Sequence, residues 1–261
     1  MRKAGIVGIL LALAAGGCSS SSSSATAPAA TTQLNVFAAA SLTAAFTKIG
    51  TDYEAANAGM KVTFNFGSST DLAAQIESEG TADVFASASG TAMDTVEAKP
   101  GVTDRTNFAT NELVIVTPPD NPGSVDDIKD LGTPGVKLVL AAEGVPVGDY
   151  ARESLKNAGV YDVALKNVVS NEPDDSSVVA KVVSGDADAG IVYTSDVSAA
   201  AGNQLRSVAI PEDINVLATY PIAVVTGSTN ATAARSFEDY VVGPAGQATL
   251  KTFGFGPPPT G

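Results

Sequence analysis

Two segments of this chain place a serine where a predicted strand turns into a helix. Ser41 follows the apolar run at 34–38, and Ser69 follows the alternating run at 61–66. The first N–H groups of a helix have no partner inside the helix and carry partial positive charge. Hydroxyls beside two such helix starts can bind an oxyanion without a charged side chain. The simpler interpretation is that each serine only caps its helix.

The composition excludes most catalytic mechanisms in which a serine acts as the nucleophile. The 261 residues contain no histidine, so a Ser-His-Asp triad and a histidine-rich metal site are ruled out. No segment matches a phosphate-binding loop or a dinucleotide glycine fingerprint, and we expect no cofactor. Lys48 and Lys61 are not beside the serines in sequence. An exported serine hydrolase is therefore only a remote alternative, and we expect no enzymatic activity.

An acidic run at 172–175 is the other group of residues that could do chemistry. It lacks the alternating oxygen ligands of a calcium-binding loop. Acidic residues in a first helical turn interact favourably with the helix dipole. We therefore interpret Asp174 and Asp175 as a helix start whose backbone N–H groups remain available.

The N-terminus has the features of an export signal. Arg2 and Lys3 precede an apolar run at 6–15 that is too short to span a bilayer. Residues 15–18, Ala-Gly-Gly-Cys, resemble the lipobox of bacterial lipoproteins. We expect a signal peptide at 1–17, lipid on Cys18, which is the single cysteine, and a Ser/Ala/Thr-rich tether at 18–33.

The net charge limits the possible partners. The formal charge of the whole chain is -13 at pH 7, which makes nucleic acid an unlikely partner. An acidic protein that binds an anion must do so through local dipoles, because its long-range field repels the ligand. This agrees with a site built from helix starts and hydroxyls.

The pattern of elements after residue 34 predicts an α/β fold with mainly parallel sheets. The chain is 44% hydrophobic and long enough for one large or two medium globular units. Short apolar or alternating runs are interspersed with segments of helical period. We expect strands at 34–38, 61–66, 83–86, 113–116, 137–141, 167–170, 190–192, 205–210 and 220–225.

Several motifs together resemble the molybdate-binding protein (ModA) family of ABC importers. They lie at 36–43, 66–73, 82–88, 190–196 and 220–225. The resemblance implies a bilobed, type II periplasmic-binding-protein fold: two α/β lobes with mixed sheets, joined by a two-segment hinge. We expect one lobe at 34–113 plus 218–255, the other at 114–217, and a disordered tail at 256–261.

The resemblance also implies which residues bind the ligand. Ser41, Ser69 and Tyr193 match hydroxyl donors, while Val147 and Asp175 match positions that donate a backbone N–H. These groups would hold the metal of molybdate through its oxo groups. Relatives commonly carry an aliphatic residue and then arginine where this chain has Asp175 and Ser176. Because a carboxylate facing the ligand would repel a dianion, we expect the Asp175 side chain to point outward.

The expected function is binding of molybdate or tungstate outside the cytoplasm and delivery to an ABC permease. We expect a monomer that is held at the outer face of the cell membrane through lipid on Cys18. Neutral donors satisfy a fully deprotonated oxyanion but give the O–H of a protonated phosphate no acceptor. Sulfate carries no proton either, so a carrier of another tetrahedral oxyanion such as sulfate is the main alternative.

Overall fold

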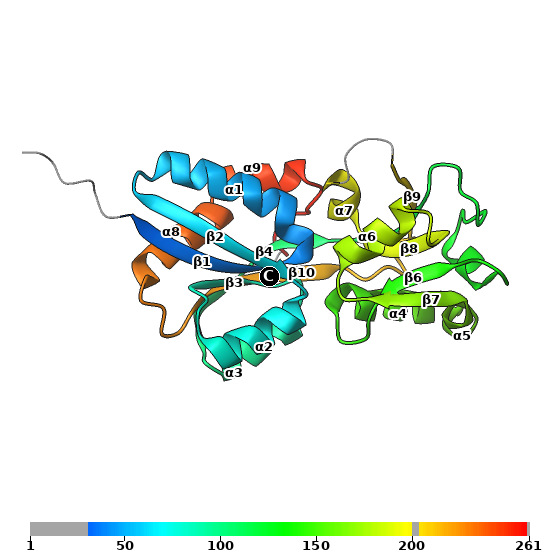
Figure 1. Ribbon diagram of the computed structural model, residues 1–261, viewed down its shortest axis with the longest axis horizontal. Coiled ribbons are helices and arrows are strands. Elements are labelled where there is room, and N and C mark those ends of the chain that lie inside the picture. The colour runs from blue at the N-terminus through cyan, green and yellow to red at the C-terminus, as the bar shows by residue number, and fades with distance from the viewer. Residues whose placement is uncertain (1–30, 200–203, 260–261) are drawn as a thin grey trace, which may run out of the picture. The chain divides into compact units, whose positions relative to one another are not determined.

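The computed structural model of the chain describes residues 31–199 and 204–259. Its strands form two separate five-stranded sheets, one in each of two α/β lobes (Figure 1). Each sheet combines parallel and antiparallel neighbours, so the predicted fold of two α/β lobes with mixed sheets is confirmed. The predicted signal peptide and the lipid site at Cys18 lie outside the described residues.

The first sheet has the strand order β2-β1-β3-β10-β4. β1 (Thr32–Ala39) lies parallel to β2 (Met60–Gly67) and to β3 (Val84–Ala86). β10 (Ala218–Val225) runs antiparallel to β3 and to β4 (Val102–Asn111). The apolar residues of β1 are buried because helices cover both faces of the sheet. The three parallel strands end at one common edge.

Helices pack on both faces of this first sheet. One face carries α1 (Thr43–Ala56), α8 (Ala231–Val242) and α9 (Pro244–Thr252), and the other carries α2 (Ser69–Glu79) and α3 (Gly90–Ala98) (Figure 1). The core therefore has two parts, one on each side of the sheet. A short 3-10 helix, η1 (Ala40–Leu42), connects β1 to α1.

The second sheet has the strand order β7-β6-β8-β5-β9. β6 (Leu138–Ala141) lies parallel to β7 (Val168–Glu172) and to β8 (Ala189–Tyr193). β5 (Leu113–Thr117) runs antiparallel to β8 and to β9 (Arg206–Ala209). The parallel strands again end at one edge, as they do in the first sheet.

Two longer helices contact the second sheet, and four short ones complete the lobe. α4 (Pro146–Asn157) and α6 (Asp175–Val183) both contact β6 and β8. Their apolar side chains join the same core cluster as the strands. The short helices are η2 (Ile128–Gly132), α5 (Tyr161–Ala164), η3 (Leu165–Asn167) and α7 (Thr194–Ala199).

The chain passes between the two sheets at two places. Glu112 alone separates β4 from β5, and residues 210–217 connect β9 to β10. Two crossings agree with the expected two-segment hinge. The lobe boundaries at 34–113 plus 218–255 and at 114–217 stay a prediction, and β5 of the second sheet already begins at Leu113.

Residues 256 and 257 contact β4, the strand from which the chain first crosses to the second sheet. Gly256 forms a bridge with Thr110, and the Thr110 hydroxyl donates to the carbonyl of Pro257 at 2.9 Å. Ordered contacts therefore extend into the segment at 256–261 that was expected to be disordered. Within the described ranges, no helix is both long and apolar enough to cross a membrane.

Candidate functional site

The carboxyl ends of the parallel strands from both sheets surround one small cavity, which leaves about 10 Å³ for the centres of water-sized spheres. Ligands of open α/β sheets commonly bind beyond these strand ends. The five residues predicted to bind the ligand all line this cavity. Its lining residues are Ala39, Ala40, Ser41, Gly67, Ser68, Ser69, Ala88, Val145, Pro146, Val147, Asp175 and Tyr193. None of these described residues is a lysine, arginine or histidine.

Ser69 is held so that its proton is free to face the cavity. Its hydroxyl oxygen accepts a hydrogen bond from the Ala88 N–H at 2.9 Å. The capping role at this helix belongs to Ser68, whose hydroxyl accepts from the Asp71 N–H. Because Ser69 accepts on one side and is almost fully buried, it can donate on the other. Ser69 is therefore not a helix cap.

Ser41 is oriented by a buried network that reaches the hinge. Its hydroxyl oxygen lies 2.9 Å from that of Tyr220. The Asn111 amide donates to Tyr220 at 3.3 Å and to the Ser195 hydroxyl at 2.8 Å. Since Tyr220 accepts from Asn111, it can donate to Ser41, which leaves the Ser41 proton for a ligand.

The expectation that Ser41 is the N-cap of the following helix is wrong. Ser41 is the middle residue of η1, and α1 begins two residues later at Thr43 without a side-chain cap. Tyr220, Asn111 and Ser195 were not identified from the sequence as part of the site. The only signal was a tyrosine at the start of an apolar strand, which is also typical of ordinary packing.

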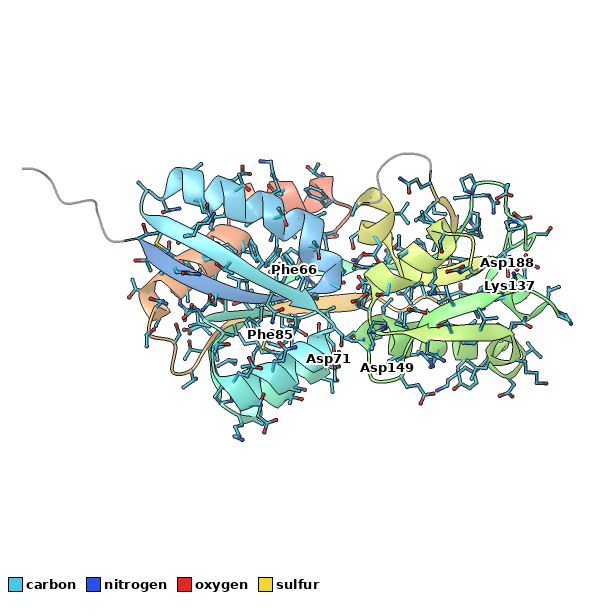
Figure 2. The ribbon with its side chains drawn as sticks, in the orientation of Figure 1. Phe66, Asp71, Phe85, Lys137, Asp149 and Asp188 are labelled. Atoms are coloured by element: carbon cyan, nitrogen blue, oxygen red, sulfur yellow. The ribbon has the colours of Figure 1, made fainter. Side chains whose placement is uncertain are left out.

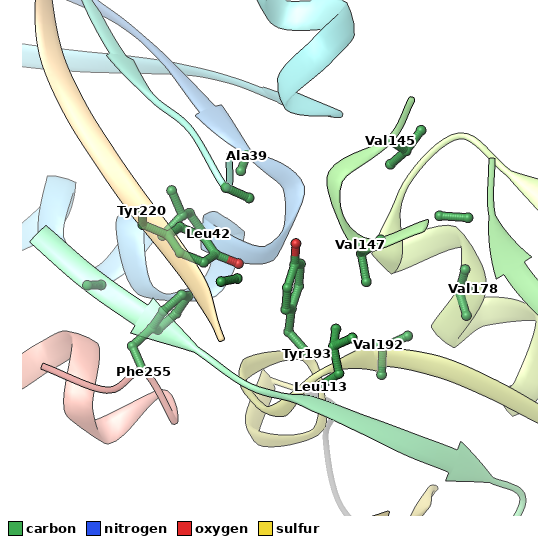
Figure 3. Packing of buried hydrophobic residues seen from close by; sticks show 14 of the residues in the cluster. Ala39, Leu42, Leu113, Val145, Val147, Val178, Val192, Tyr193, Tyr220 and Phe255 are labelled. Carbon is green, nitrogen blue, oxygen red and sulfur yellow. The ribbon is translucent and has the colours of Figure 1, made fainter. Parts of the chain in front are cut away.

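Tyr193 presents an unused hydroxyl at the carboxyl end of β8. This oxygen is buried and has no hydrogen-bond partner among the described residues. Figure 3 shows it pointing to the space between Ala39 of one lobe and Val145 and Val147 of the other. Burial raises the pKa of Tyr193 well above its usual value, so the hydroxyl keeps its proton and can donate.

Val147 contributes the start of α4. Pro146 and Val147 are the first two helical residues, where backbone N–H groups lack partners inside the helix. The buried guanidinium of Arg152 donates to the carbonyls of Ala141 and Gly148 at 2.7 and 2.8 Å. Arg152 thus fastens the first turn of α4 to the end of β6 and fixes where the Val147 N–H lies.

The prediction that the Asp175 side chain points outward is wrong. The residue is the first of α6 and is only 4% exposed. Its carboxyl faces that of Asp196 and is also approached by the backbone N–H groups of Asp175 itself and Ser176. Asp196, which the sequence did not single out, lies beside Asp175 and outside the lining of the cavity.

The two lobes also touch beside the cavity. The Thr70 hydroxyl at the start of α2 donates to the Gly144 carbonyl, just before α4, at 2.5 Å. Figure 2 shows Asp71 and Asp149 in the first turns of these two helices. The first turns of α2 and α4 thus come together where the lobes meet, which is the arrangement of a closed cleft.

A bilobed α/β fold that encloses a small cavity with hydroxyl and N–H donors from both lobes defines a solute-binding protein. A model of the family "Bacterial extracellular solute-binding protein" matches residues 34–256. The molybdate-binding protein ModA of Mycobacterium tuberculosis H37Rv is 40% identical over 237 residues, which are 88% of each chain. This chain belongs to the ModA family of extracytoplasmic solute-binding proteins.

Solved structures show the same fold. The periplasmic molybdate-binding protein of Azotobacter vinelandii has a TM-score of 0.76 at 22% identity and covers 87% of this chain and 100% of its own. The sulfate-binding protein SubI of Mycobacterium tuberculosis H37Rv has a TM-score of 0.75 at 17% identity, with 87% of both chains covered. The predicted type II periplasmic-binding-protein fold is confirmed.

Proposed function

We propose that this chain binds molybdate, and also tungstate, in the cavity between its lobes and delivers it to an ABC permease. The observation that carries the proposal is the donor set. The Ser69 hydroxyl accepts from the Ala88 N–H, the Ser41 hydroxyl lies 2.9 Å from that of Tyr220, and the Tyr193 hydroxyl is buried without a partner among the described residues. All three hydroxyls can donate toward the cavity, and the N–H groups of Val147 and Asp175 add two further donors.

Neutral donors suit a fully deprotonated tetrahedral oxyanion. They stabilise its charge in a buried place where water does not compete, without a cation. A protonated phosphate would bring an O–H group that needs an acceptor, and leaving it unpaired costs about 1–3 kcal/mol. The cavity is also too small for a nucleotide or a drug-sized molecule, whose sites run to roughly 300–1,000 Å³.

Sulfate is the second candidate because it also carries no proton at neutral pH. A sulfate-binding protein shares the fold, so the fold alone does not choose between the anions. The 40% identity to a molybdate-binding protein favours molybdate. We propose that the longer metal–oxygen bonds of molybdate and tungstate fit the spacing of donors from both lobes, which sulfate is too small to bridge.

We propose no catalytic role for the serines. A nucleophilic serine needs an adjacent general base, and the residues lining the cavity include neither histidine nor lysine. The one ionisable acid there, Asp175, faces Asp196 and not a serine. The family to which the chain belongs is one of solute carriers.

We further propose that the mature protein is a monomer held at the outer face of the membrane by lipid on Cys18. The support is the sequence Ala-Gly-Gly-Cys at 15–18 after an apolar run. Labelling of cells with a radioactive fatty acid tests this. The wild-type chain should carry the label in the membrane fraction, and a Cys18→Ala variant should carry none.

Calorimetric titration of the mature chain with molybdate, tungstate, sulfate and phosphate tests the ligand. We expect tight binding of the first two anions only. Ser41→Ala and Ser69→Ala should each weaken molybdate binding about tenfold or more, because a hydrogen bond to a charged group is worth about 1.5–3 kcal/mol. Ser78→Ala, on the exposed side of α2, is the matched control. Preferential binding of sulfate or phosphate would contradict the assignment.

A further inference from the structure

Asp175 and Asp196 form a pair of buried carboxyl groups beside the cavity. They are 4% and 7% exposed, and each side chain lies within hydrogen-bonding range of the other. The pair comes from two helices, since Asp175 begins α6 and Asp196 lies in α7. Its neighbours of the same or potential negative charge are Asp174 beside it and the hydroxyls of Tyr193 and Tyr220.

The hydrogen bonds around this pair require a proton. One oxygen of Asp196 accepts from the Tyr193 N–H at 2.8 Å. Oδ2 of Asp175 has no donor among the described residues, and the largest charge effects on the two carboxyls come from other carboxyls, Asp174 among them. Two ionised carboxylates cannot face each other in such a buried place, so one must carry a proton that the other accepts.

The start of α6 makes the pair sensitive to a ligand. The N–H groups of Asp175 and Ser176 lie near the Asp175 carboxyl and act to lower its pKa, which favours its ionised form. The N–H of Asp175 is also one of the donors assigned above to the oxyanion. When an oxyanion takes that donor, the carboxyl loses part of the support for its charge, and it meets a dianion across the cavity. Both changes favour protonation.

We propose that the Asp175–Asp196 pair, which shares one proton before binding, takes up a second proton when an oxyanion binds, so that Asp175 meets the ligand as a neutral group. The inference rests on the proposed function and identifies Asp196 as the residue that positions and shares the proton. It explains how a chain with aspartate at this place keeps a site for a dianion. Protonation of Asp175 also removes an acceptor that could otherwise accept a hydrogen bond from the O–H of a protonated phosphate.

The sign of the coupling follows from linkage. Burial, the first cause, raises the pKa of Asp175 to about 6 and that of Asp196 well above its usual value. At pH values below the pKa for the second proton, the unliganded pair already carries both protons and the affinity for a dianion is constant. Above that pKa the second proton must be taken up on binding, so the affinity falls, by at most tenfold per pH unit.

Calorimetry of the mature chain with molybdate, in buffers of different ionisation enthalpy between about pH 6 and pH 9, measures this coupling. We expect uptake that approaches one proton per molybdate and an affinity that decreases as the pH rises. Asp175→Asn should abolish both effects. Asp174→Asn removes a neighbouring charge but keeps an oxygen to cap α6, and it should retain the uptake.

An infrared measurement separates failure of this inference from failure of the proposed ligand. The unliganded wild-type protein at neutral pH should show a protonated carboxyl band that disappears in Asp175→Asn and Asp196→Asn. Absence of that band overturns the inference whether or not molybdate binds. Molybdate binding without proton uptake overturns it, and so does preferential binding of hydrogen phosphate, since Asp175 would then be acting as an ionised acceptor.

Discussion

The hydroxyl oxygens of Ser41 and Tyr220 lie 2.9 Å apart although 179 positions separate them in the chain. Ser41 follows the first strand of the first sheet, and Tyr220 lies in β10, the strand on which the chain returns from the second lobe. Tyr220 also packs edge to face on Tyr193, with ring centroids 5.9 Å apart. Residues at the hinge thus fix the position of the Ser41 hydroxyl, which we propose binds the ligand.

Replacement of Tyr220 by phenylalanine should weaken oxyanion binding while keeping the aromatic packing. Without the Tyr220 hydroxyl beside it, the Ser41 hydroxyl loses its fixed orientation. We expect the affinity for molybdate to fall about fivefold to tenfold, since one neutral hydrogen bond contributes roughly 1 kcal/mol. Calorimetry of Tyr220→Phe measures the change, and Tyr240→Phe, on α8 away from the cavity, should bind normally.

The same substitution should also relax the selectivity. In Tyr220→Phe the Ser41 oxygen gains a free acceptor position, which can accept from the O–H of a protonated oxyanion. The ratio of molybdate to phosphate affinity should therefore decrease. An equal loss for both anions would mean that Tyr220 only supports the local structure.

A methyl group at Gly148 should disrupt the first turn of α4. A Cβ atom there would lie 2.5 Å from the Ala141 carbonyl oxygen and closer still to that of Ala142, so backbone would have to move. We expect Gly148→Ala to lower the free energy of unfolding by about 1–3 kcal/mol and to impair binding through the misplaced Val147 N–H. Denaturant unfolding and calorimetry measure these effects.

Ser154 provides a control on the same helix. Its hydroxyl is buried without a hydrogen-bond partner in the described part of the chain, so Ser154→Ala removes an unsatisfied group. That variant should bind normally and be equally or more stable. Normal binding by Gly148→Ala would show that the α4 start tolerates displacement and would argue against Val147 as a donor.

Loss of the contact between Thr70 and Gly144 should favour the open form. This 2.5 Å hydrogen bond joins the two lobes and can form only when they close. Thr70→Val should reduce the affinity for molybdate about fivefold, mainly through faster dissociation. Stopped-flow measurements give the dissociation rate. Thr95→Val is the control, because the Thr95 hydroxyl bonds to Thr91 within α3; equal rates would contradict a role for the contact in closure.

Glu238 should make stability depend on pH. Burial raises its pKa to about 7, against the opposing effect of Arg235 at 3.1 Å. The stabilisation from its protonated form is complete below the unfolded pKa of about 4.5 and is lost as the pH rises through about 7. Glu238→Gln should therefore be more stable than wild type at pH 8, by about 1–3 kcal/mol, and not at pH 5.

Thermal unfolding at the two pH values measures the effect of Glu238→Gln. Glu79→Gln, at the exposed end of α2, is the matched control and should show no comparable change between pH 5 and pH 8. If Glu238→Gln is no more stable than wild type at pH 8, the carboxyl keeps an ordinary pKa in the folded protein.

The strand ends were the part of the site that local sequence patterns could predict. Apolar runs followed by Ser41, Ser69 and Tyr193 placed these residues at the carboxyl edges of strands, and parallel strands bring such edges together. These features depend on periodicity and turn signals that are local in sequence. Val147 was identified through the family resemblance and not through a local pattern.

Other features depend on tertiary contacts and could not be predicted. β4 contains mostly polar residues in its first half and forms because it pairs with β10 at the edge of a sheet. The inward turn of Asp175 depends on Asp196, 21 positions later, and on the N–H groups of its own helix. Charge repulsion argued for an outward side chain, but a shared proton changes that balance.

The donors proposed for the oxyanion are divided between the lobes: Ser41 and Ser69 belong to one, and Val147, Asp175 and Tyr193 to the other. With this donor set, neither lobe alone would surround an oxyanion. Binding of an ion in the small cavity would therefore set the relative position of the two lobes and of their outer surfaces. A membrane partner that contacts both lobes could detect a loaded carrier from the outside, without ever touching the ion.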